Sequence, residues 1–234
     1  MLSPYLPPIM KLGVIYVDLQ TDFCEPSGSL FVFGSNTLAA DIEAMEAAIG
    51  HENYASIFTL DSHPADHVSF VTNNPGAELY KEITLPNGVK QVMWPVHCVD
   101  GTPGHGIAPP LDAFVQAAHK RAGGFFEVKK GTISGVDSYS GFGSADGVSE
   151  ITPLLAYLQS KEITHLLVLG VAFDYCVAAT AKDAIKHGFK TCVVRQATRS
   201  VAAESSIKEE NLMKEAGVVI ADTLDQMKGF LVDL

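Results

Sequence analysis

Cysteine and tryptophan are scarce in this sequence, and it has no long hydrophobic run. The 234 residues include one tryptophan and four cysteines, at positions 24, 98, 176 and 192, with no CxxC pair. This usage argues against a disulfide framework and favours reduced thiols in a cytoplasmic protein. The longest apolar run beside a predicted strand, Leu166–Phe173, is far too short to span a bilayer. Residues 1–10 are apolar but carry three prolines and no basic start, so they predict a loosely ordered arm and not a signal peptide.

Positive charge is also in short supply. Lysine and arginine together number 16 against 27 aspartates and glutamates, which gives a formal net charge of −11. Nucleic acids and anionic membranes are bound by basic surfaces, so we expect neither as a partner. The composition leaves open whether the chain forms a homo-oligomer.

What is present is a large apolar fraction, 47% of the residues against 18% charged, enough for one substantial core. Short apolar segments rich in β-branched residues alternate with helical patterns along the chain. The predicted strands are Leu12–Val17, Tyr54–Leu60, Phe125–Val128, Thr164–Val171, Lys190–Val194 and Val218–Ile220. The predicted helices are Ser35–Ile49, Leu111–His119, Glu150–Leu158, Tyr175–Lys186 and Ala203–Ala216. This order predicts an α/β fold, a doubly wound and mostly parallel six-stranded sheet with helices on both faces, in a single domain over residues 1–234.

Reactive side chains stand where four of these strands end. Asp18 follows the first strand, Asp61 the second and Lys130 the third, and Cys176 comes shortly after the fourth. Open α/β sheets form their sites beyond the carboxyl ends of the strands, so these groups are expected to converge. A buried cysteine is most often a small apolar side chain, but Cys176 opens a helix after a strand, where a thiolate is favoured. Together with Asp18 as a base and Lys130 as a cation, it predicts nucleophilic catalysis.

Histidines form a second group. Asp61 and His63 are two residues apart on an extended chain and so lie on one side of it, and His97 comes from a distant loop segment. One carboxylate and two or three imidazoles suit Zn²⁺, with Fe²⁺ or Mn²⁺ as alternatives. The predicted metal ligands are therefore Asp61, His63 and His97. His67 is either a further ligand or a residue behind the ligands, and we favour the second position.

Five motifs, in order along nearly the whole chain, resemble the nicotinamidase branch of the isochorismatase-like, or cysteine hydrolase, superfamily. They are Asp18–Phe23 (DLQTDF), Asp61–Phe70 (DSHPADHVSF), Trp94–Gly104 (WPVHCVDGTPG), Lys130–Gly131 with Tyr139–Phe142 (YSGF), and Gly170–Val177 (GVAFDYCV). Thr21 and Gln196 depart from the family pattern, and neither replaces a catalytic group.

The resemblance implies a role for each motif. Asp18, Lys130 and Cys176 would be the catalytic residues, with backbone N–H groups of Ala172 and Cys176 as the oxyanion hole and a cis Val171–Ala172 peptide. The substrate-binding residues would be Phe23, Trp94, Tyr139 and Gln20. The implied reaction is hydrolysis of nicotinamide to nicotinate and ammonia with one divalent metal ion, feeding NAD salvage. Pyrazinamide is the second substrate that the family suggests.

Other functions remain open at this point. A sister amidase acting on carbamoyl or ureide substrates would keep the aspartate, lysine and cysteine but generally lack the metal-binding motifs. A non-catalytic binding module on the same scaffold would usually have lost one of those three residues. Isochorismatase itself lacks the cysteine nucleophile, and a thiol redox protein would need a resolving cysteine that the sequence does not identify.

Overall fold

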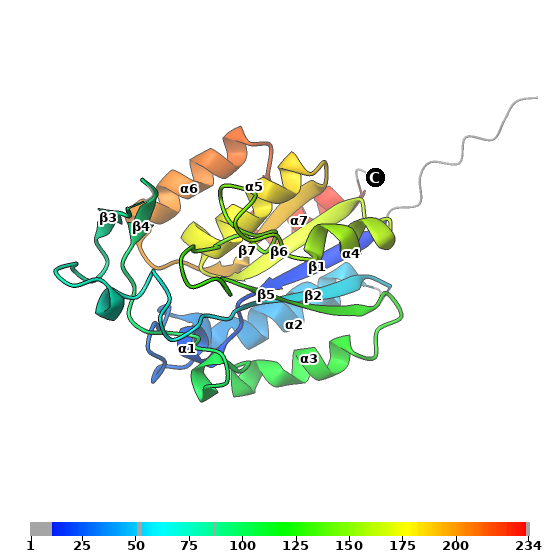
Figure 1. Ribbon diagram of the computed structural model, residues 1–234. Coiled ribbons are helices and arrows are strands. Elements are labelled where there is room, and N and C mark those ends of the chain that lie inside the picture. The colour runs from blue at the N-terminus through cyan, green and yellow to red at the C-terminus, as the bar shows by residue number, and fades with distance from the viewer. Residues whose placement is uncertain (1–10, 51–52, 87, 233–234) are drawn as a thin grey trace, which may run out of the picture.

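The computed structural model describes residues 11–50, 53–86 and 88–232. The predicted arm, residues 1–10, lies outside this range. The main sheet has six strands, all parallel, in the order β5-β2-β1-β6-β7-β8 (Figure 1). Its strands are β1 (Leu12–Val17), β2 (Ala55–Asp61), β5 (Phe125–Lys130), β6 (His165–Val171), β7 (Lys190–Arg199) and β8 (Val219–Ala221). The predicted doubly wound sheet is thus confirmed.

Helices cover both faces of the sheet, as Figure 1 shows. On one face lie α2 (Leu38–Ile49), α3 (Asp112–Ala118) and α7 (Leu224–Val232), and on the other α4 (Leu154–Ser160), α5 (Ala178–Lys186) and α6 (Ala203–Glu215). Each face has its own apolar cluster, and the central strands β1 and β6 are buried throughout because they contribute side chains to both. Burial on two sides explains why these strands read as continuous apolar runs.

The long segment between β2 and α3 contains only short elements. These are the antiparallel hairpin β3 (Glu82–Thr84) and β4 (Lys90–Val92) and the single 3₁₀ turns Val71–Asn73, Pro103–His105 and Pro109–Leu111. The earlier loop after β1 holds α1 (Thr21–Cys24) and a 3₁₀ turn at Ser35–Thr37 that precedes α2. No helix among the described residues is long and apolar enough to cross a membrane.

Several predicted boundaries differ from the structure by a few residues, and two of the differences have identifiable reasons. The prediction ended the fifth strand at Val194, before Arg195, but β7 continues to Arg199 with an irregular register opposite Gly170. Arg195 is accommodated because its guanidinium lies 4.2 Å from the centre of the Phe173 ring. The predicted helix at Glu150 begins only at Leu154, because the Glu150 side chain bonds to the turn after β5.

The topology determines which edge of the sheet can form a binding site. The chain adds β2 on one side of β1 and later β6 on the other, so the strand order reverses at β1. In open α/β sheets the crevice at such a reversal, beyond the carboxyl ends of the strands, is where ligands bind. Asp18 follows β1 directly, and the segment with Cys176 follows β6.

Candidate active site

Lys130, the last residue of β5, lies at the centre of a buried charge cluster. Its Nζ is 2.9 Å from Asp18 Oδ2, 2.5 Å from Asp61 Oδ1 and 3.3 Å from Cys176 Sγ. Lys130 and Asp18 are fully buried, and Cys176 is only 5% exposed. The structure therefore brings the three predicted catalytic residues together around one ammonium group. Asp18 is held in place by the Thr59 hydroxyl, which donates to its Oδ1 at 2.6 Å.

Burial and charge determine the protonation of this cluster. Burial raises the pKa of Asp18, against the opposing effect of Lys130. Burial also raises the pKa of the Cys176 thiol well above its ordinary value, although the Lys130 ammonium works in the opposite direction. Lys130 itself stays charged, because the two carboxylates outweigh the effect of burial and raise its pKa. A neutral thiol beside a carboxylate base and a fixed cation is the arrangement that allows proton transfer at the moment of attack.

Cys176 lies in a π-helical turn, Phe173–Val177, that leads directly into α5, and not in the first turn of an α-helix. The preceding Val171–Ala172 peptide is cis, as the motif comparison implied. Both Ala172 and Cys176 line a small cavity beside the charge cluster. The N–H groups of Tyr175 and Val177 donate to the Ala172 carbonyl, which fixes the turn.

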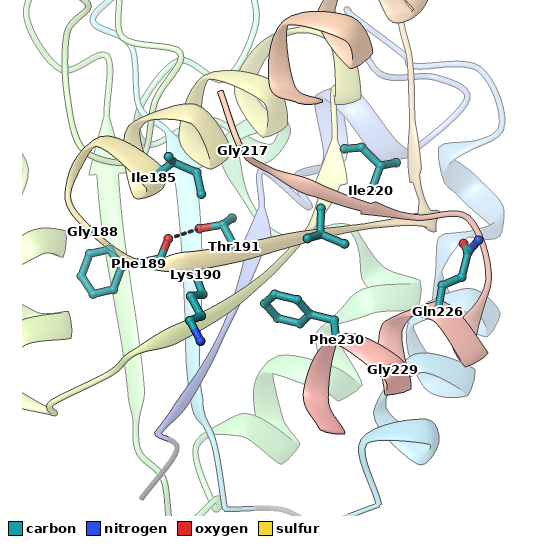
Figure 2. Close-up of a pocket in the computed structure, with 11 residues that line it drawn as sticks. Ile185, Gly188, Phe189, Lys190, Thr191, Gly217, Ile220, Gln226, Gly229 and Phe230 are labelled. Atoms are coloured by element: carbon teal, nitrogen blue, oxygen red, sulfur yellow. Dashed lines mark hydrogen bonds between the residues drawn. The ribbon is translucent and has the colours of Figure 1, made fainter. Parts of the chain in front are cut away.

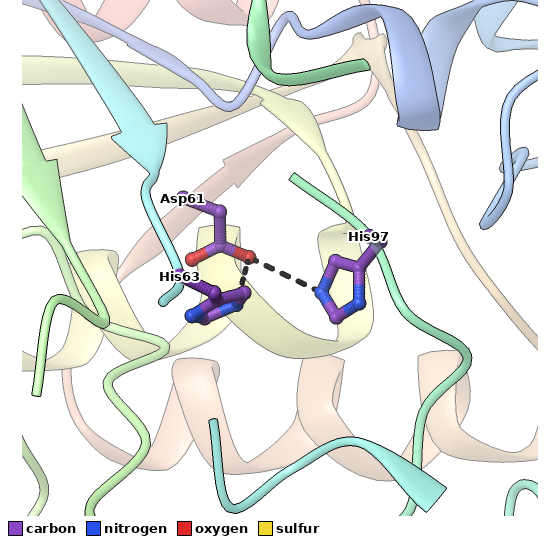
Figure 3. Close-up of side chains that lie close together, drawn as sticks. All are labelled: Asp61, His63 and His97. Carbon is purple, nitrogen blue, oxygen red and sulfur yellow. Dashed lines mark ion pairs between the residues drawn. The ribbon is translucent and has the colours of Figure 1, made fainter. Parts of the chain in front are cut away.

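Asp61, His63 and His97 meet at the edge of the same cluster (Figure 3). Asp61 Oδ2 lies 3.4 Å from His63 Nε2 and 3.7 Å from His97 Nε2. Each imidazole donates its Nδ1–H to a backbone carbonyl, His63 to Gly131 and His97 to Pro95, both at 2.8 Å. Both Nε2 atoms therefore face the carboxylate, and the three ligand atoms lie within 4.8 Å of one another. One carboxylate and two imidazoles so placed fit a divalent metal ion.

His67 has both ring nitrogens engaged elsewhere. Its Nδ1 is 2.8 Å from the Ser69 hydroxyl and its Nε2 is 3.1 Å from the Val136 carbonyl. The ring stacks on His63 with 4.0 Å between ring centres. This arrangement favours a place behind His63, since both ring nitrogens of His67 bond to Ser69 and Val136 and not to Asp61 or His97.

The cavity beside Cys176 is lined by aromatic side chains. Phe23, Trp94 and Tyr139 all reach it, and the Trp94 indole N–H donates to the Tyr139 hydroxyl at 3.0 Å. Its free volume is about 30 Å³. The lining residues that the sequence did not indicate are Leu30, Val32, Tyr175 and Val201. Tyr175 adjoins Cys176 in sequence and could have been inferred, whereas the other three come from loops without a recognisable pattern.

A known protein family matches most of this chain. A model of the isochorismatase domain matches residues 13–225. The chain belongs to the isochorismatase family. Within it, the nicotinamidase/pyrazinamidase of Mycobacterium tuberculosis is 37% identical over 211 residues, which cover 88% of this chain and 96% of that protein.

Solved structures in the isochorismatase family agree with the fold. The yeast nicotinamidase bound to the inhibitor nicotinaldehyde superimposes with a TM-score of 0.81 at 29% identity, covering 91% of this chain and 100% of that one. The pyrazinamidase of Pyrococcus horikoshii in complex with zinc gives a TM-score of 0.69 at 28% identity, covering 91% and 99%.

Gln20 is the one predicted substrate-binding residue that does not line the cavity of this family member. Its side chain is completely buried and bonds to backbone groups of the neighbouring strand end. Its Nε2 donates to the Asp61 carbonyl at 2.7 Å and to the His105 carbonyl at 2.9 Å, and its Oε1 accepts from the Asp61 N–H at 2.8 Å. Gln20 thus holds the backbone of Asp61 in place.

Asp174 is a residue of the nucleophile motif that received no role from the sequence. Its carboxylate accepts hydrogen bonds from the N–H groups of Val201 and Ala202, at 2.9 and 3.1 Å, and from the Ser205 hydroxyl. These donors lie at the start of α6, where backbone N–H groups lack helical partners. Asp174 therefore joins the turn that carries Cys176 to the next helix.

Replacing Asp174 with alanine is expected to destabilise the protein by about 1–3 kcal/mol, because two backbone donors lose their acceptor. Urea unfolding would measure this, with Asp183→Ala as the control. Asp183 forms a surface ion pair with Lys186, whose side chain is 73% exposed, so its loss should cost no more than about 0.5 kcal/mol. Equal stability of the two variants would contradict the structural role of Asp174.

A larger cavity, of about 730 Å³, lies away from this site (Figure 2). It opens between the turn after α5, the strands β7 and β8, and α7, with Phe189, Ile220 and Phe230 among its apolar walls. Lys190 is the only charged side chain among the described residues that line it. Size alone does not locate the chemistry here, because the titratable groups that could act together lie at the other cavity.

Proposed function

We propose that this enzyme hydrolyses nicotinamide to nicotinate and ammonia through a thioester on Cys176. The observation that carries the proposal is the position of the Lys130 ammonium, in contact with the thiol, the base Asp18 and the proposed metal ligand Asp61. The similarity to nicotinamidases over most of the chain supports the substrate. The ureide amidase is less favoured because the Asp61, His63 and His97 group is complete.

In the proposed reaction the Cys176 sulfur attacks the amide carbon while Asp18 accepts the thiol proton. Lys130 stabilises the negative charge that develops on sulfur as Asp18 takes up the proton, and the N–H groups of Ala172 and Cys176 bind the developing oxyanion. Asp18 then returns the proton to the departing nitrogen, and the C–N bond breaks to give ammonia and a thioester. Water, deprotonated by Asp18, cleaves the thioester and regenerates the thiol, with nicotinate as the product.

Asp61, His63 and His97 would hold one divalent cation, for which we propose Zn²⁺ with Fe²⁺ or Mn²⁺ as alternatives. The donor set of one carboxylate and two imidazoles supports this choice, and a zinc complex of a family member supports zinc. When bound, the ion would supply a Lewis acid that orients the pyridine nitrogen. Phe23 and Trp94 would hold the ring between them, and Tyr139 would line the same cavity.

The physiological setting follows from the proposed product. Nicotinate would enter NAD salvage, and we propose a cytoplasmic enzyme that takes small pyridine amides, pyrazinamide included. A homo-oligomer is compatible with these proposals, and none of the catalytic steps requires one.

Purified protein is expected to release ammonia from nicotinamide, and removal of metal with a strong chelator should lower the rate at least tenfold. The reason is that a pyridine ring without its metal anchor loses the alignment that attack by Cys176 requires. Ammonia release would be measured with and without chelator, followed by addition of Zn²⁺, Fe²⁺ or Mn²⁺ in turn. If metal-loaded protein left nicotinamide intact but cleaved a ureide, the substrate assignment would be wrong.

A further inference from the structure

The turn from Lys130 to Thr132 serves both halves of the site. Lys130 reaches into the catalytic cluster, and the carbonyl of the next residue, Gly131, accepts the Nδ1–H of His63 at 2.8 Å. Gly131 has φ +65°, and a Cβ atom there would lie 2.5 Å from His63 Cε1. Any larger residue would therefore displace the imidazole. The position of this turn determines the orientation of His63.

Glu150 holds the turn with three hydrogen bonds. Its Oε2 accepts from the Gly131 N–H at 2.7 Å, and its Oε1 accepts from the Thr132 N–H at 2.8 Å and from the Thr132 hydroxyl at 2.6 Å. The residue is 8% exposed, and its own backbone is bonded to Ser144. Glu150 is thus a nearly buried carboxylate, fixed in place by its own backbone contacts.

The Thr132 N–H and the Gly131 carbonyl belong to the same peptide group. A carboxylate that accepts from the N–H polarises this group and makes its carbonyl a stronger acceptor. The carbonyl in turn draws on the Nδ1–H of His63, which increases electron density at Nε2, the nitrogen 3.4 Å from Asp61 Oδ2. Carboxylates that act on a ligating histidine are known to raise its basicity and fix its tautomer.

We propose that Glu150 is a positioning residue that orients and activates His63 for metal binding through the Gly131–Thr132 peptide group. The inference rests on the proposed metal site. Glu150 lies 19 residues after Gly131, in a segment for which the sequence predicted a helix. The hydrogen bonds of the Glu150 carboxylate go to Gly131 and Thr132, and Glu150 is not among the described residues that line the cavity beside Cys176. Its link to His63 is therefore the peptide group between Gly131 and Thr132.

Glu150→Gln is expected to weaken Zn²⁺ binding about tenfold or more, the loss typical when such an outer partner is removed. Affinity would be measured on metal-free protein by competition with a chromogenic chelator. Glu127→Gln, on the exposed side of β5, removes the same charge and should leave affinity unchanged. Thr132→Val removes the hydroxyl but keeps the N–H, so it should also bind Zn²⁺ nearly as the unaltered protein does.

The possible outcomes distinguish the relay, meaning the action of Glu150 on His63 through the Gly131–Thr132 peptide group, from the metal site itself. Equal Zn²⁺ affinity in Glu150→Gln and the unaltered protein would overturn the relay alone, and absence of Zn²⁺ binding in the unaltered protein would overturn both. If Thr132→Val weakened Zn²⁺ binding as much as Glu150→Gln, Glu150 would act only as an anchor of the loop. That result would also overturn the relay.

A measurement without substitution covers the case in which the Glu150 variant fails to fold. In the zinc-loaded protein the Nδ1 proton of His63 is expected to resonate downfield of that of His97. The acceptor of His97 is the Pro95 carbonyl, at the same 2.8 Å, and among the described residues no carboxylate bonds to that peptide group. Coincident ¹H–¹⁵N resonances for the two imidazoles would contradict the relay.

Discussion

Cys176→Ala is expected to lower kcat for nicotinamide by about 10⁴-fold or more, the scale of loss when a catalytic nucleophile is removed. No other thiol can replace it. Cys24, Cys98 and Cys192 are buried and none of them lines the cavity beside Ala172, which Cys176 does. Ammonia release at saturating nicotinamide would measure the change. Nicotinamide affinity should be nearly retained, because the aromatic side chains and the metal ligands remain.

The matched control is Cys192→Ala, which removes a buried thiol from the core on the other side of β7. It should unfold at somewhat lower urea concentration and keep kcat within about twofold. A Cys176→Ala enzyme that retained more than a few per cent of the activity would show that water attacks the amide directly. The thioester would then be excluded.

Much of this site could be predicted from the sequence because parallel strands end at a common edge. Once Asp18, Asp61 and Lys130 are assigned to strand ends, the topology alone brings them to one crevice. The positions of the predicted substrate-binding residues could be inferred less directly from the sequence. Phe23 and Trp94 line the cavity as expected, whereas Gln20, from the same motif as Phe23, turns its side chain to the backbone of Asp61.

What the sequence could not indicate are contacts that join distant loops. Glu150 looks like the first residue of a helix, and only the folded chain brings its carboxylate to Gly131. Asp22 is similar, since its Oδ2 accepts the Cys98 N–H at 2.7 Å and so fixes the loop that carries His97. Helix α7 was missed although five of its nine residues are apolar, and only Met227 among them is fully buried. The contacts of Glu150 and Asp22 have no periodic pattern in the sequence, and they depend on tertiary packing.

Lys130 holds together two carboxylates that would otherwise repel each other. Asp18 and Asp61 have oxygen atoms within 4.8 Å of one another and of Cys176 Sγ. The ammonium, with its three close contacts, keeps the pKa of Asp61 well below its ordinary value, together with His63 and despite burial. Removal of one partner from a buried ionic group usually costs more than the pair contributed, because the remaining charge stays desolvated.

Lys130→Ala is therefore expected to destabilise the metal-free protein by about 3–5 kcal/mol at neutral pH and to abolish turnover. Without the ammonium, Asp18 and Asp61 ionise less readily in the folded protein than in the unfolded chain. Their folded pKa values are then raised, so the folded variant gains stability as the pH falls and loses it as the pH rises. Urea unfolding at two pH values would measure this.

The neighbouring Lys129→Ala is the control. It removes a surface pair with Asp100, whose side chain is 57% exposed, and should destabilise the protein by about 1 kcal/mol or less at both pH values. A Lys130→Ala protein as stable as Lys129→Ala, with no gain on acidification, would mean that the two buried carboxylates already share a proton, and Asp18 could not then act as the base.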